Sequence, residues 1–146
     1  SNICFEGSDK ALPAPGVLEA IADAEQIIIA PSNPYVSIGT ILSVPGIRKA
    51  LENAPGKVAA ISPIVGGNAV KGPAARLLCE LGRPVSPLGV AQLYHSFVDL
   101  MIVDEADSAL LPHIKALGME AASAQTMMTS PQAKVTLAKQ VLELMK

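Results

Sequence analysis

The sequence predicts an α/β domain in which about four mainly parallel strands are flanked by helices, a Rossmann-like arrangement. Short apolar runs, such as residues 27–29 and 58–61, alternate with segments of helical apolar spacing. These runs are continuously apolar, which is typical of parallel strands buried on both faces. Half of the 146 residues are hydrophobic but only 3% are aromatic, so Ile, Val, Leu and Ala must build the core.

Apolar spacing in the first half of the chain predicts two helices and two strands, besides a helix expected to begin near Ile38. A helix within residues 12–23 precedes the first strand, residues 27–30. Pro45 suits the first turn of the next helix, because its missing N–H would be unpaired there, and Pro55-Gly56 ends that helix. Residues 58–61 form the second strand.

The second half continues the alternation with four helices and two strands. The expected helices span residues 73–81, 87–97, 106–117 and 131–145. The expected strands span residues 100–103 and 120–124, and the second of these is a weak pattern. Gly82 and Gly118 end the helices before them. The apolar stripe of the last helix consists of Val135, Leu137, Ala138, Val141 and Leu142.

Length, charge and cysteine usage exclude several classes of protein. Residues 1–146 are long enough for a single domain with its own core. The net charge is −2 and the basic residues are scattered, which disfavours nucleic acid as a partner. The apolar runs are too short to span a membrane and no signal peptide is visible. Cys4 and Cys79 lack metal-site spacing, and we expect Cys79 in the core and a reducing, cytoplasmic setting.

Two polar turns follow the first two predicted strands. Ser32-Asn33-Pro34 comes after the first strand, and residues 62–73, rich in Gly and Pro, come after the second. In an open parallel sheet, ligands bind just outside the carboxyl ends of the strands. The two turns are therefore expected to form one ligand cleft.

The first turn has a structural and a functional interpretation. Ser32 and Asn33 suit a polar turn that caps the next helix, but they also suit contact with a phosphate or nucleoside. Ser37 is a candidate cap for a helix that begins near Ile38, where backbone N–H groups would meet an anion. Gly39 would let a ligand approach the backbone closely.

The second turn is open to the same two interpretations. Gly66-Gly67 with Lys71 is either a flexible connection or a set of amides and a cation that face a phosphate. The order of these residues does not match a Walker A loop.

Most other polar candidates are assigned structural roles. Asp104, Glu105 and Asp107 follow the third strand and are expected to cap a helix, although carboxylates at strand ends also suit magnesium.

Two histidines and two methionines complete the set of candidates. His95 is expected to be a structural residue rather than a general base, and His113 a surface residue. Met127 and Met128 are expected to be packing residues.

Several short motifs, taken in order over nearly the whole chain, resemble the 2-phospho-L-lactate transferases, which assemble the deazaflavin coenzyme of methanogens and actinobacteria. The motifs are Pro13-Ala14-Pro15-Gly16-Val17, residues 32–39, Val44-Pro45-Gly46-Ile47, residues 62–67, Lys71-Gly72-Pro73-Ala74, Gly89-Val90-Ala91 and Thr126-Met127-Met128.

The resemblance implies a metal-assisted transfer of a phospholactyl or phosphoenolpyruvyl group from a guanosine-diphospho donor to the ribityl hydroxyl of the deazaflavin precursor. GMP would leave, and magnesium would neutralise the diphosphate oxygens. The positions expected to bind substrate are Ser32, Asn33, Pro34, Ser37, Gly39, Ser62, Gly66, Gly67 and Lys71.

The chain departs from the family pattern in one respect. Members of the family are about twice this length, and their N-terminal half carries a Gly-rich turn and an Asp that this chain lacks. We therefore expect the chain to be the second half of a larger domain, with most magnesium ligands elsewhere and little activity alone. The face left open by the missing half predicts a homo-oligomer.

A related family offers the alternative. The gluconeogenesis-factor proteins share the fold, bind nucleotide sugars and lack transferase activity. Their first turn typically reads Gly-Pro-Gly-Ser-Leu-Tyr-Thr-Ser, whereas this chain has Asn33-Pro34 and the 62–67 turn, which favour the transferase.

Overall fold

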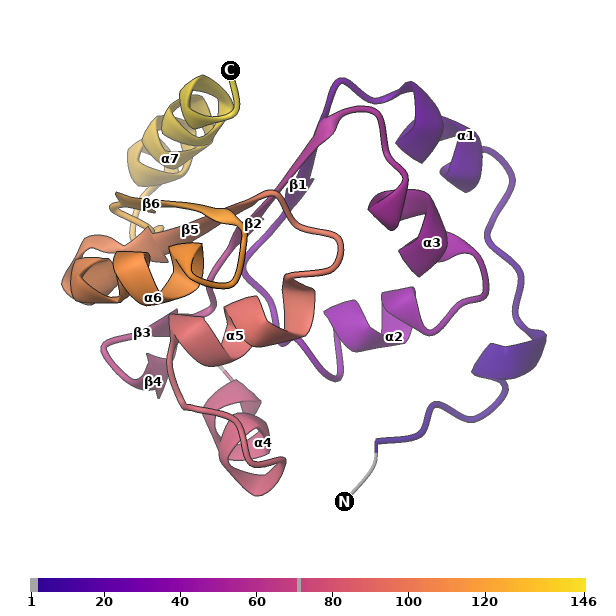
Figure 1. Ribbon diagram of the computed structural model, residues 1–146, viewed down its shortest axis with the longest axis horizontal. Coiled ribbons are helices and arrows are strands. Elements are labelled where there is room, and N and C mark those ends of the chain that lie inside the picture. The colour runs from indigo at the N-terminus through magenta and orange to yellow at the C-terminus, as the bar shows by residue number, and fades with distance from the viewer. Residues whose placement is uncertain (1–2, 71) are drawn as a thin grey trace.

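A four-stranded parallel sheet organises the computed structural model, which describes residues 3–70 and 72–146 (Figure 1). The strand order is β1-β2-β5-β6, and each neighbouring pair is parallel. The strands are β1 (Gln26–Ile29), β2 (Lys57–Ile61), β5 (Leu100–Asp104) and β6 (Glu120–Ala124). The predicted fold class is confirmed, including the weakly patterned last strand.

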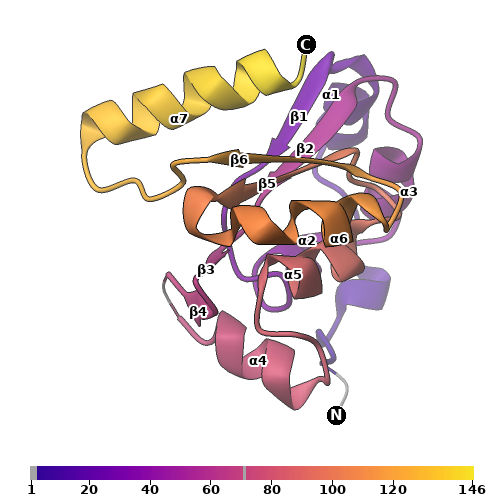
Figure 2. The ribbon, with the colours of Figure 1, turned by 60° about the vertical axis from the view of Figure 1, so that its left-hand side comes forward.

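Helices cover both faces of the sheet, but unequally. Alternate strand residues such as Val58 and Met101 contribute to a large core beneath α1 (Val17–Asp23), α3 (Ile47–Glu52), α5 (Pro87–Tyr94) and α6 (Leu111–Lys115). The intervening residues, such as Ala59 and Leu100, form a smaller core with α7 (Pro131–Leu144). Figure 2 shows α7 by itself on its side of the sheet.

The first strand is not buried on both faces, contrary to the sequence prediction. β1 lies at an edge of the sheet and pairs only with β2 in the described chain. Ile27 and Ile29 pack on the large core, but Ile28 points to the other face and is 41% exposed. The small core under α7 is built on β2, β5 and β6, so it leaves Ile28 uncovered.

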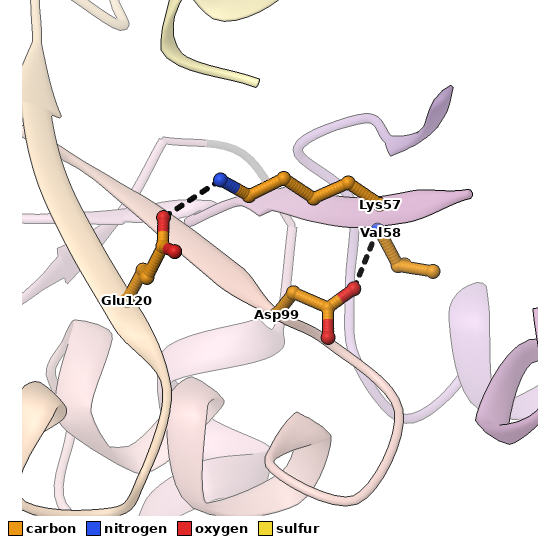
Figure 3. A network of polar contacts seen from close by, with 4 residues as sticks. All are labelled: Lys57, Val58, Asp99 and Glu120. Atoms are coloured by element: carbon orange, nitrogen blue, oxygen red, sulfur yellow. Dashed lines mark hydrogen bonds and ion pairs between the residues drawn. The ribbon is translucent and has the colours of Figure 1, made fainter. Parts of the chain in front are cut away.

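Polar contacts tie the amino ends of three strands together (Figure 3). The Asp99 carboxylate accepts a hydrogen bond from the Val58 N–H at 2.8 Å. Lys57 on β2 forms an ion pair with Glu120 on β6 at 2.7 Å, across the intervening β5. These contacts fix strand ends that lie opposite the candidate site described below.

A small hairpin between β2 and α4 (Ala74–Glu80) was not predicted. β3 (Ile64–Val65) and β4 (Asn68–Ala69) pair antiparallel through Gly66-Gly67. Both glycines have positive φ, 57° and 77°, as a two-residue hairpin turn of the primed type requires. The Gly-Gly pair was therefore a hairpin signal rather than a flexible connection.

Two helices differ from their predicted form, one in its first residue and one in its continuity. α3 begins at Ile47, after Gly46 with φ 94°, rather than at Pro45. The predicted helix 106–117 is a 3-10 segment, η2 (Glu105–Leu110), followed by α6. Pro112 explains that break, because it has no N–H to donate within a continuous α-helix. The remaining elements are α2 (Ile38–Leu42) and a short 3-10 turn, η1 (Ser8–Lys10).

Fewer side chains of α4 and α7 are buried than the sequence predicted. Cys79 is exposed, because α4 buries only the face that carries Ala74 and Leu78. On α7, Leu137 and Val141 are buried, while Val135, Ala138 and Leu142 are exposed, since the helix meets the sheet along one row of side chains. None of the helices in the described ranges has the length and apolarity to span a membrane.

Candidate functional site

A cleft of about 760 Å³ opens at the carboxyl ends of the strands. The turn after β1 and the turn after β2 both line it, as the sequence predicted. The segment that connects β6 to α7 forms a third wall. The residues that line the cleft are Pro31, Ser32, Asn33, Val36, Ser37, Ser62, Pro63, Val70, Gly72, Pro73, Thr126, Met127, Met128, Thr129 and Lys134. Its volume falls in the usual range for small-molecule sites.

Asn33 shapes the first wall through its side-chain oxygen. Oδ1 accepts hydrogen bonds from the backbone N–H of Tyr35 at 2.9 Å and of Val36 at 3.2 Å. The side-chain Nδ2 is buried and has no partner among the described residues. Oδ1 thus orders this polar turn, but α2 itself has no side-chain cap, and Nδ2 is a donor that a ligand oxygen would satisfy.

The two serines of the cleft differ in what their hydroxyls do. Ser37 precedes α2 but makes no side-chain hydrogen bond to the helix, so the predicted cap is wrong. Ser62 is almost fully buried, and its hydroxyl donates to the Ile64 carbonyl and accepts from the Ile64 N–H. Ser62 therefore holds its turn in place, whereas the Ser37 hydroxyl is available to a ligand.

Asp104, at the carboxyl end of β5, positions the third wall. Its Oδ2 accepts hydrogen bonds from the Thr126 N–H at 3.0 Å and the Thr126 hydroxyl at 2.9 Å. Its Oδ1 accepts from the Ala106 N–H at 3.1 Å, which is the cap that the sequence predicted. Both residues are buried, so this carboxylate fixes where the 126–129 segment leaves the sheet.

Two opposing effects set the pKa of Asp104. Burial raises the pKa of this carboxyl group. The hydrogen bonds from Ala106 and from the backbone and hydroxyl of Thr126 together outweigh burial, so the pKa lies below the usual value for Asp. The group is ionised at neutral pH, as a carboxylate that accepts three hydrogen bonds should be.

Four exposed apolar side chains surround the polar floor of the cleft. They are Val36, Val70, Met127 and Met128. The two methionines, predicted as packing residues, are instead exposed at the cleft, because the chain turns away from the sheet after Thr126. An apolar rim of this kind suits a flat ring system.

The electrostatic character of the cleft favours an anion. Among the described residues that line it, Lys134 is charged and no Asp or Glu is present. Lys134 lies in the first turns of α7, whose N-terminus is capped by the Ser130 hydroxyl. Lys134 was not among the residues predicted from the sequence, although the strand-end rule applied to β6 points to the segment that leads into its helix.

Four of the predicted site residues lie away from this cleft. Pro34 and Gly39 line a neighbouring cavity instead, and a Cβ on Gly39 would lie 3.1 Å from the Pro34 carbonyl oxygen. Gly66 and Gly67 form the hairpin turn, outside the cleft lining. Lys71 lies outside the described residues.

The hairpin turn is also unsuited to the phosphate contact that the sequence allowed. The Gly66 N–H donates to the Asp107 carboxylate at 2.9 Å, so this amide is occupied and has a negative charge beside it. Asp107 therefore anchors the hairpin to η2.

The remaining titratable candidates do not assemble a metal centre. Within residues 3–70 and 72–146, no three His, Cys, Asp or Glu side chains come together in a way that could hold a metal ion. Asp104 and Asp107 both accept hydrogen bonds from the protein. His95 and His113 are exposed, and His95 Nδ1 lies 3.0 Å from the Gln92 carbonyl oxygen. The described residues thus do not fit magnesium by themselves.

Comparison with known proteins adds independent information. The family described as 2-phospho-L-lactate transferase CofD matches residues 2–141. The chain is 44% identical over 139 residues to a phosphoenolpyruvate transferase of Kitasatospora aureofaciens, covering 94% of this chain and 43% of that protein. It is 43% identical over 142 residues to a 2-phospho-L-lactate transferase of Methanosarcina mazei, covering 97% and 46%. The chain thus spans less than half the length of these relatives.

Proposed function

Because the chain belongs to the 2-phospho-L-lactate transferase CofD family, we propose that its cleft binds the guanylated donor of a phosphorus-group transferase. In that reaction a phospholactyl or phosphoenolpyruvyl group moves from a guanosine-diphospho donor to the ribityl hydroxyl of the deazaflavin precursor. Relatives named for each acyl group match this chain almost equally well, so both donors remain within the proposal.

The observation that carries the proposal is the cleft itself. It lies at the strand ends, has no acidic side chain among its described lining residues, and has Lys134 at its wall. A diphosphate needs hydrogen-bond donors and positive charge, and the N-terminus of α7 adds to both. The exposed side chains of Val36, Val70, Met127 and Met128 suit the guanine or deazaflavin ring.

The reaction assigns distinct roles to the residues of this chain. The acceptor oxygen attacks the phosphorus that carries the acyl group, a new P–O bond forms, and the P–O bond to GMP breaks. The proton of the acceptor hydroxyl passes to solvent. Lys134 and the Ser37 hydroxyl would hold the phosphate oxygens in line for this displacement, and the Asp104–Thr126 pair would keep the third wall in position.

Magnesium belongs to the proposal as a companion of the donor. When bound to the diphosphate it would neutralise charge on the leaving group. The described carboxylates do not form a site for it, and we propose that its protein ligands lie outside this chain.

Titration calorimetry with GDP and with UDP-glucose tests the proposal. We expect GDP to bind more tightly, and Lys134→Gln to weaken GDP binding about three- to tenfold at low salt. Lys139→Gln is the matched control, because Lys139 is an exposed lysine on the same helix that does not line the cleft. Preferential binding of UDP-glucose, or equal effects of both variants, would instead favour a regulatory nucleotide-sugar module of the gluconeogenesis-factor type.

A further inference from the structure

A second cavity, of about 410 Å³, lies on the helical side of the molecule. Its walls come from the segment before η1, from the turn after β1, from α2, α3 and α5, and from the segment that follows α4. These helices lie on the face of the sheet opposite α7 (Figures 1 and 2). The lining is mainly apolar, with Ile3, Phe5, Leu42, Leu81 and Leu93.

The polar side chains that line this cavity are two arginines and two tyrosines, all of which can donate hydrogen bonds. They are Arg48, Arg83, Tyr35 and Tyr94, and no Asp or Glu lines the cavity among the described residues. Guanidinium groups only donate, and a phenol donates through its O–H. The lining therefore presents positive charge and donors without an anionic partner of its own.

Neither arginine is neutralised elsewhere in the described part of the chain. The Arg48 guanidinium lies 4.9 Å from the centre of the Phe97 ring, and Arg83 donates to the neutral amide oxygen of Gln92 at 3.3 Å. The ion pairs found in residues 3–70 and 72–146 involve Lys57, Arg76 and Lys146 instead. Both charges at the cavity thus lack a carboxylate partner.

Tyr94 supplies a further unsatisfied group. The residue is 2% exposed, its ring packs against Phe97 at 5.3 Å between centroids, and its hydroxyl has no hydrogen-bond partner among the described residues. Burial raises the pKa of this hydroxyl, so it remains protonated and able to donate. Buried hydroxyls in native proteins usually have an acceptor.

We propose that this cavity binds a small organic anion whose carboxylate or phosphate lies between Arg48 and Arg83 and whose apolar body packs on the leucines. The site is separate from the strand-end cleft, and the two share only the turn after β1. Asn33 faces the cleft, whereas Pro34 and Tyr35 line the cavity.

Tyrosine is a selective spectroscopic reporter for this cavity. The chain has two tyrosines and no tryptophan, and both tyrosines line the cavity. Protein that contains 3-fluorotyrosine should give two ¹⁹F resonances, assigned with Tyr35→Phe and Tyr94→Phe. Titration with phenyl phosphate or benzoate, up to about 20 mM, should shift both resonances to saturation. Benzyl alcohol, which has the same ring without the charge, should shift them far less.

Charge-neutralising variants then locate the anion. Arg48→Gln and Arg83→Gln should each weaken phenyl phosphate binding at least about fivefold. Tyr94→Phe should weaken it several-fold without lowering Tm, because the ring contact with Phe97 is kept. Arg76→Gln is the matched control, since Arg76 is exposed, pairs with Glu80 and does not line the cavity.

Three results would overturn the proposal. The first is the absence of a saturable shift with either anion, and the second is an equal response to benzyl alcohol. The third is a Tyr94 resonance that shifts when the protein alone is diluted but does not shift when either anion is added. That result would indicate that a carboxylate from a second copy of the chain occupies the cavity. GDP binding at the cleft is measured separately by calorimetry. A failure to bind GDP would therefore not change the interpretation of the ¹⁹F titration.

Discussion

Asn33 combines a structural and a functional role in one side chain. Its oxygen orders the turn through Tyr35 and Val36, and its buried amide nitrogen has no partner among the described residues. Substitution by alanine removes both roles at once, so it does not separate folding from binding. An isosteric change that keeps the oxygen does.

Asn33→Asp should therefore keep the fold and lose the ligand. The carboxylate still accepts from the two N–H groups, so the free energy of unfolding measured in urea should stay within about 1 kcal/mol of that of the original protein. The added charge should weaken GDP binding at least about tenfold, because it repels the diphosphate. Urea titration and calorimetry measure the two effects. Unchanged GDP affinity would show that the turn has no contact with the donor.

Ser37→Ala gives the complementary test at the same turn. Ser37 makes no hydrogen bond to α2, so its removal should change stability by less than about 0.5 kcal/mol. A lost hydrogen bond to a charged phosphate should weaken donor binding about tenfold. A variant that loses stability but binds GDP normally would contradict this assignment.

Among the elements, the link between β5 and the segment after β6 depends on the ionisation of Asp104. In Asp104→Asn an NH₂ group replaces one acceptor oxygen and faces the donors of Thr126 or Ala106. We expect this variant to lower the free energy of unfolding by about 1–3 kcal/mol at pH 7. Thr126→Val should cost less, because the Thr126 N–H still donates to Asp104.

The same pair predicts a pH dependence. The folded pKa of Asp104 is depressed, so its stabilisation is complete above the unfolded value of about 3.9 and is lost as the pH falls through the folded pKa. The stability difference between the original protein and Asp104→Asn should therefore shrink in acid. Urea unfolding at neutral pH and below about pH 3 measures it. A difference that stays constant would show that the carboxylate is not the titrating group.

Helix α5 carries a conflict between helix propensity and packing. Alanine in place of Gly89 should favour a helix by up to about 1 kcal/mol. However, a Cβ on Gly89 would lie 2.0 Å from the Pro84 carbonyl oxygen, which is backbone and cannot rotate away. The clash should dominate, so we expect Gly89→Ala to destabilise the protein by about 1–3 kcal/mol in denaturant titration. A stabilised variant would show that the 84–89 turn adjusts freely.

For the whole molecule, the unequal covering of the sheet makes α7 critical. Leu137 on this helix is 3% exposed and packs on Ile61, Leu100 and Ile102, while Val135 two residues earlier is 54% exposed. Leu137→Ala should cost about 2–5 kcal/mol, and Val135→Ala less than about 0.5 kcal/mol. Guanidinium unfolding of the two variants makes the comparison. Equal losses would contradict the view that one row of α7 closes this core.

The homo-oligomer and the cytoplasmic setting stay predictions. The exposed side chain of Ile28 at the β1 edge is consistent with the apolar surface on which the oligomer was predicted. Light scattering over a range of concentrations tests it, and a strict monomer at high concentration would refute it.

Local patterns in the chain predict the α/β class, the four main strands and the convergence of two turns on one cleft, because these depend on apolar periodicity and on the geometry of parallel sheets. Motifs along the chain also indicate the family. The role of each side chain, by contrast, depends on contacts that exist only in the folded chain. Asp107 occupies the Gly66 amide, Gly39 faces a second cavity, and Lys134 reaches the cleft from a helix more than ninety residues after Asn33. Such contacts join segments distant in the chain, so no local pattern encodes them.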